Sequence, residues 1–85
     1  MKVYVLIITS QLGQGDQPSS IVLGVYESRE RAVQAHHATV VDEMAEYVEN
    51  YDEVATRDTY LGTLITRPSD DSCWTLIQLH ESEML

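Results

Sequence analysis

One segment with helical periodicity lies between two pairs of strand-like segments, and this order limits the folds that the chain can adopt. Within residues 29–51, large side chains recur at intervals of three and four, which places them on one side of an α-helix. These side chains are Val33, His37, Val40, Met44, Tyr47 and Tyr51. We expect this side of the helix to face a sheet.

The flanking segments are rich in β-branched and aromatic residues, which is typical of strands. They cover residues 2–10 and 21–26 before the helix, and residues 59–66 and 73–79 after it. Polar loops within each pair favour two antiparallel hairpins. The first segment is apolar on both faces, so we predict that it is an interior strand.

A chain of 85 residues is short enough to build only one hydrophobic core. The prediction is therefore a single α+β domain covering residues 1–85. It has a mainly antiparallel sheet of about four strands, in the chain order β-β-α-β-β, packed on one long helix.

Local signals set the ends of these elements. Ser28 is a favourable N-cap and Glu30 suits the first helical turn, so the helix is predicted to begin at Arg29. The polar residues 50–58 are expected to contain its end, and residues 67–72 have the composition of a turn.

Among the features of the composition, the net charge departs most from the average of globular proteins. Fourteen Asp and Glu residues against five Lys and Arg residues give a formal net charge of −9. Binding nucleic acid or an anionic membrane requires basic side chains that neutralise phosphates. We therefore expect no direct nucleic-acid contact, no membrane association and a basic protein partner.

Cys73 is the single cysteine, so no intrachain disulfide can form. This is expected of a protein in a reducing compartment, and we predict a cytoplasmic location. Cys73 has no basic neighbour that would activate a thiolate, and no phosphate-binding loop or metal-ligand spacing is present. We expect no cofactor and no metal.

The amino-terminal half carries a recognisable pattern. It consists of residues 3–6 (VYVL), residues 24–26 (GVY) shortly before Ser28, and residues 29–32 (RERA). It resembles a group of small bacterial and phage proteins of unknown function that share a VYVL strand, a GVY strand end and a REKA helix start. The resemblance covers residues 2–35. It implies a strand-strand-helix unit and no transferable active site.

Acidic side chains form a second periodic set on the predicted helix. Stepping about 100° per residue, Asp42, Glu46, Glu49 and Glu53 fall in a narrow band opposite the sheet-facing side. Such a band keeps a helix soluble, but like charges four residues apart cost a few tenths of a kcal/mol each, which favours a role in binding. The predicted partner-binding residues are Asp42, Glu43, Glu46, Glu49, Asp52 and Glu53.

The acidic band and the lack of a catalytic motif predict a non-enzymatic binding protein. Its expected action is inhibition of a basic nucleic-acid-handling machine by charge mimicry, as in a phage protein directed against a CRISPR effector or a restriction enzyme. We include this class because the group that the amino-terminal half resembles contains phage proteins.

Two other interpretations stay open. His36 and His37 are adjacent, so on a helix they point about 100° apart and do not form a metal-binding pair. One of them could act as an acid–base in a pocket between helix and sheet, which would make the chain a small dimeric α+β enzyme. Alternatively, an exposed sheet face could mediate self-association in an assembly module or homodimer.

Overall fold

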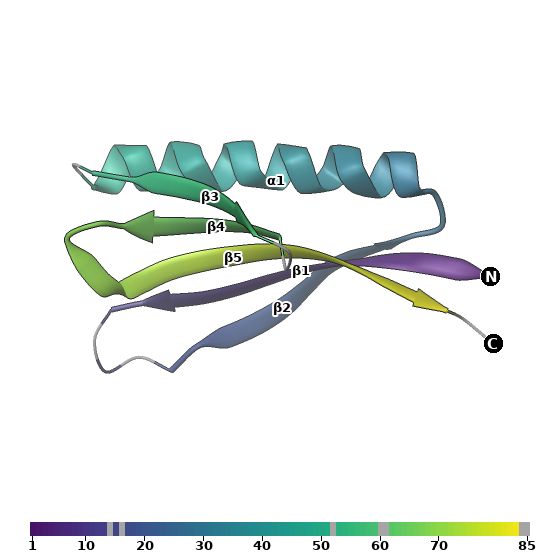
Figure 1. Cartoon of the computed structure of the whole chain (residues 1–85), viewed down its shortest axis with the longest axis horizontal. Helices are drawn as coiled ribbons and strands as arrows, with labels where there is room; N and C mark the ends of the chain where they lie inside the picture. The colour runs from purple at the N-terminus through teal and green to yellow at the C-terminus, as the bar shows by residue number, and fades with distance from the viewer. Residues whose placement is uncertain (14, 16, 52, 60–61, 84–85) are drawn as a thin grey trace.

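The computed structural model describes residues 1–13, 15, 17–51, 53–59 and 62–83. One helix lies along one face of a five-stranded antiparallel sheet (Figure 1). The elements are β1 (Lys2–Leu12), β2 (Ser19–Tyr26), α1 (Arg29–Asn50), β3 (Ala55–Thr59), β4 (Gly62–Arg67) and β5 (Asp70–Glu83). The predicted α+β class, the antiparallel sheet and the single long helix are confirmed, with one strand more than expected.

The strand order across the sheet is β2-β1-β5-β4-β3. The first two strands form the predicted hairpin, and β4 and β5 form the second. β1 lies inside the sheet because its whole length also pairs with β5, from Lys2 opposite Glu83 to Leu12 opposite Cys73. The apolar character of β1 on both faces therefore predicted its interior position correctly.

The extra strand, β3, occupies part of the segment that we expected to contain only the helix end. Its sequence, ATRDT, has no large apolar residue. As the last strand of the sheet, β3 pairs with β4 alone, and an edge strand can carry charged and polar side chains. Hydrophobic patterning cannot detect such a strand.

The two ends of α1 follow the local signals. Ser28 Oγ accepts a hydrogen bond from the Arg31 backbone N–H at 3.4 Å, and Glu30 lies in the first turn. At the other end, the Tyr51 N–H donates to the Tyr47 carbonyl at 2.9 Å while Tyr51 itself is extended. The helix thus ends at Asn50, within the predicted range.

The core lies between α1 and the central strands. Its buried members are Leu6, Tyr47, Ile65, Cys73 and Ile77. The Tyr47 hydroxyl hydrogen bonds to Thr75 Oγ1 at 2.7 Å, and both residues are buried. This bond fastens the carboxyl-terminal half of the helix to β5.

The helix is turned about its axis relative to the sequence prediction. Four of the six side chains expected to face the sheet, Val40, Met44, Tyr47 and Tyr51, pack on the core as predicted. Val33 and His37 are exposed, and Ala32 and His36 lie against the sheet instead. The centre of the sheet-facing side is displaced by about 70° when 100° is assigned to each residue. The small side chains of alanines allow this side of the helix to lie close to the sheet, and His36 Nε2 lies 3.2 Å from the Ile77 carbonyl oxygen.

Among the described residues, no helix has both the length and the hydropathy needed to cross a membrane.

Candidate functional site: an acidic pocket beside the helix

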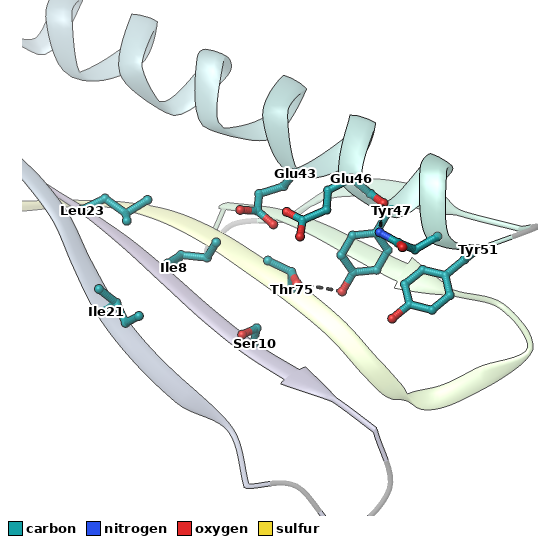
Figure 2. A pocket seen from close by; sticks show the side chains of 10 residues that line it. Ile8, Ser10, Ile21, Leu23, Glu43, Glu46, Tyr47, Tyr51 and Thr75 are labelled. Atoms are coloured by element: carbon teal, nitrogen blue, oxygen red, sulfur yellow. Dashed lines mark hydrogen bonds between the residues drawn. The ribbon is translucent and has the colours of Figure 1, made fainter.

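A pocket of about 390 Å³ opens between the carboxyl-terminal half of α1 and the strands β1 and β2 (Figure 2). Its floor is apolar and consists of Ile8 from β1 and Ile21 and Leu23 from β2. The helix side contributes two carboxylates, Glu43 and Glu46. We call this site the acidic pocket. The polar and aromatic residues that complete its lining are Ser10, Tyr47, Asn50, Tyr51 and Thr75.

The rotation of the helix creates this arrangement. Because Tyr47 is held on Thr75, Glu43, one turn earlier on the same side, is also brought over the sheet. Figure 2 shows the side chains of Glu43 and Glu46 next to one another, both turned from α1 toward the strands. The pocket thus combines negative charge at the helix with apolar surface below it.

Glu43 is only partly accessible to solvent. Burial raises the pKa of its carboxyl group, and the neighbouring carboxylates of Glu46 and Asp42 raise the pKa further. Removing a carboxylate from water is unfavourable unless a cation or a hydrogen bond compensates for it. Glu43 therefore lies where its negative charge is costly to the folded chain.

The chain's own basic residues do not offset this charge. Within the described part of the chain, no ion pair joins Glu43 or Glu46 to a basic side chain, whereas Lys2 pairs with Glu81 at 3.0 Å on the surface. Arg67 lies over the ring of Tyr51, 4.0 Å from its centroid. The pocket is therefore open to an external cation.

The structure separates the predicted partner-binding residues. Asp42, Glu46 and Glu49 are exposed on α1. Glu43, which we expected beside the acidic band on the outward side of the helix, is turned toward the sheet instead. Glu53 is exposed but follows the helix end, so its expected place in a helical band is wrong. Asp52 lies outside the described residues.

The acidic band is also not opposite the sheet, as the sequence predicted. With the rotation of about 70°, Asp42, Glu46 and Glu49 follow the flank of α1 beside the acidic pocket. The outermost side of the helix instead carries small and β-branched residues, among them Val41 and Val48, whose exposed fractions are 53% and 63%. The negative surface thus lies next to the pocket and is continuous with it.

Sequence reasoning did not find the apolar floor or the two tyrosines of the pocket as parts of a site. Ile8, Ile21 and Leu23 have the composition of ordinary strand residues. The spacing of Glu43 and Tyr47, four residues apart, was the one available signal, because it places a carboxylate above a large sheet-facing side chain.

A second hollow, also of about 390 Å³, lies on the opposite flank of α1 and contains both helix histidines. His36 Nε2 is 3.5 Å from Thr63 Oγ1, and that hydroxyl donates to Asp58 Oδ1 at 3.1 Å. His36 Nε2 is also 3.2 Å from the Ile77 carbonyl oxygen, which can only accept, so the proton lies on Nε2 and is shared between this carbonyl and Thr63 Oγ1. His37, also in the lining, is more exposed than His36.

No three His, Cys, Asp or Glu side chains of the described residues are grouped in a way that could hold a metal ion. Cys73 is a free, buried thiol.

A comparison of the chain with protein-family models, with curated proteins and with solved structures found no match in any of the three. The similarity of residues 2–35 to small bacterial and phage proteins thus stays a prediction.

Proposed function

We propose that this chain is a non-enzymatic binding protein that docks on a basic protein partner. The docking surface is the acidic flank of α1, which consists of Asp42, Glu46 and Glu49 beside the acidic pocket. The observation that carries the proposal is the acidic pocket. Two carboxylates, Glu43 and Glu46, overhang apolar residues, and no basic side chain of the described residues pairs with them.

The chemistry of the pocket fits a lysine or arginine side chain of the partner. Such a side chain has an aliphatic stem and a cationic end, and it commonly buries the stem while the charge stays at a polar rim. Ile8 and Leu23 offer apolar contact for the stem, and Glu43 and Glu46 offer acceptors for the cationic end. Binding would therefore relieve the unfavourable burial of the Glu43 charge.

The rest of the charge acts at longer range. A net charge of −9 steers a basic partner toward the chain and repels nucleic acid. Proteins that handle nucleic acid present basic grooves, so they are the partner class that we propose. The chain would then act as an inhibitor that competes with nucleic acid, in the manner of a phage protein directed against a CRISPR effector or a restriction enzyme. A cytoplasmic setting fits the free thiol of Cys73.

A titration with a hexa-arginine peptide, followed by NMR, tests the proposed site. We expect the largest amide shifts around Glu43, Glu46 and the strands of the pocket floor. The double variant Glu43→Gln/Glu46→Gln removes two charges and keeps the side-chain shapes, and it should weaken binding at least about tenfold.

The matched control is Glu27→Gln/Glu30→Gln, which removes the same number of charges from exposed positions at the amino-terminal end of α1, away from the acidic flank. It should weaken binding much less. If both double variants weaken binding equally, the attraction is a general effect of net charge and the pocket has no special role.

The second hollow favours one other function. His36, Thr63 and Asp58 form a hydrogen-bonded row in a concave site, and with the proton on Nε2 the other ring nitrogen, Nδ1, is the one that can act as a base. An ester such as p-nitrophenyl acetate is a general probe of this chemistry. Turnover that is lost in His36→Asn and retained in His37→Asn would support an enzyme, and equal background rates in all three proteins would contradict it.

A further inference from the structure

The sheet face opposite α1 is covered by no helix or strand of the described residues (Figure 1). Side chains alternate between the two faces of a strand. Ile8, Ile65 and Ile77 belong to the α1 side, so their neighbours Ile7, Leu64 and Leu76 lie on the other. We call this surface the open sheet face. Its apolar residues are Val3, Val5, Ile7, Val22, Val25, Leu64, Trp74 and Leu76, of which Val3 is buried.

These apolar residues lie on four neighbouring strands, and between β1 and β5 they alternate with polar partners, since Ile7 is opposite Gln78 and Leu76 is opposite Thr9. Val22 lies opposite Ile7 in the pairing of β2 with β1, and Leu76 lies opposite Leu64 in the pairing of β5 with β4. The exposed fractions of Val22 and Val25 are 58% and 60%. The other apolar residues of this face, apart from the buried Val3, are half-buried, and exposed or half-buried apolar side chains gathered on one face indicate an interaction surface.

The open sheet face also differs from the rest of the chain in charge. Asp58, Glu81 and Glu83 are the strand carboxylates whose side chains are described, and the cross-strand pairing places all three on the α1 side. Among the described residues, the open sheet face therefore has no carboxylate, although the chain has fourteen Asp and Glu residues. Its titratable or charged members are Arg57 and His80.

We propose that the open sheet face binds a second copy of this chain, face to face, in a symmetric dimer. Two copies that each carry a charge of −9 repel one another unless they meet where carboxylates are absent. Packing through this face holds the two acidic flanks on the outer sides of the dimer. Sheets packed in this way lie about 10 Å apart with interdigitated side chains.

The size of the face is close to that of a stable interface. The strands contain 44 residues, and at about 3.3 Å per residue and about 4.8 Å per strand they span about 700 Å² of sheet per copy. A stable interface buries about 800 Å² on each partner. A foreign basic protein is the less suitable occupant, because the open sheet face offers it no negative charge.

The experiment is sedimentation velocity of the full chain over a range of concentrations. The expected species has twice the monomer mass of 9.6 kDa. Val22→Glu places a carboxylate on the open sheet face, and it should raise the dimer dissociation constant at least about tenfold. Val22 is already well exposed in the monomer, so the substitution leaves the fold intact, which circular dichroism checks.

Two matched controls receive the same change. Ile21→Glu is on the same strand but on the α1 side, with an exposed fraction of 61%, and Val48→Glu is on the outer side of the helix at 63%. Both should leave the dimer intact. A wild-type chain that is monomeric at all concentrations overturns the proposal. Dissociation caused by Ile21→Glu or Val48→Glu but not by Val22→Glu overturns it as well.

A measurement without mutation uses Trp74, the single tryptophan, which lies on the open sheet face. Dilution of the wild-type chain through the dissociation range should move its fluorescence to longer wavelength as water reaches the indole. An emission maximum that does not move while the mass halves contradicts the location of the interface. Glu43→Gln/Glu46→Gln leaves this dimer unchanged, so failure here is distinct from failure of the acidic pocket.

Discussion

The hydrogen bond between Tyr47 and Thr75 is the contact on which the position of the acidic pocket depends, and its energy can be measured. The two hydroxyl oxygens are 2.7 Å apart, and the exposed fractions of the residues are 4% and 1%. Tyr47→Phe removes one hydroxyl and leaves the other buried without this partner. A buried polar group in that state costs about 1–3 kcal/mol, so we expect the free energy of unfolding to fall by that amount.

Urea unfolding of Tyr47→Phe, Thr75→Val and the double variant tests this reasoning at one fixed protein concentration. The double variant removes both hydroxyls, so its loss should be smaller than the sum of the single losses, by about 0.5–3 kcal/mol. The control is Thr9→Val, which breaks a hydroxyl–hydroxyl bond of the same 2.7 Å length, to Ser20, at an exposed position. Single losses that add fully, or a loss in Tyr47→Phe no larger than in Thr9→Val, would refute the argument.

The same residue predicts a pH dependence. Burial is the main cause that raises the pKa of Tyr47 to about 12, from an ordinary value of 10.0. A group whose pKa is raised in the folded state stabilises the fold below its unfolded pKa. The free energy of unfolding should therefore fall as the pH rises from about 10 to about 12, and Tyr47→Phe should show less of this fall.

Three further changes test other parts of the structure. Gly62 has a φ of +145°, and a Cβ there would overlap the Ile77 carbonyl oxygen, so Gly62→Ala should cost about 1–3 kcal/mol in urea unfolding. Gly15→Ala should cost less, because Gly15 also has a positive φ, +94°, but open space around it. Ile77→Ala should cost about 2–5 kcal/mol because Ile77 is fully buried, whereas Ile21→Ala, at an exposed fraction of 61%, should cost about 0.5 kcal/mol or less in the same assay. Glu43→Gln should stabilise the fold at neutral pH and lose this advantage in acid. The reason is that the raised pKa of the Glu43 carboxyl makes the wild-type fold less stable as the pH rises through that pKa. A variant that is less stable than wild type at pH 7 would contradict the unfavourable burial of Glu43.

Local features of the sequence determined the elements and their neighbours. The Ser28 cap, the apolar first strand and the short polar segments between strands act over a few residues, and they correctly predicted the helix start, an interior β1 and two hairpins. The charge of −9 is likewise a property of composition alone. These properties are short-range or additive, so they can be predicted without knowledge of the fold.

Tertiary packing decided which side of the helix faces the sheet. Valines are spread around much of α1, so periodicity alone favoured the side of Val33, whereas the small Ala32 and the bond between Tyr47 and Thr75 selected a side about 70° away. That choice turned Glu43 toward the strands and formed the acidic pocket. It depends on contacts between residues 28 positions apart, Tyr47 with Thr75, which is why no local pattern could reveal it.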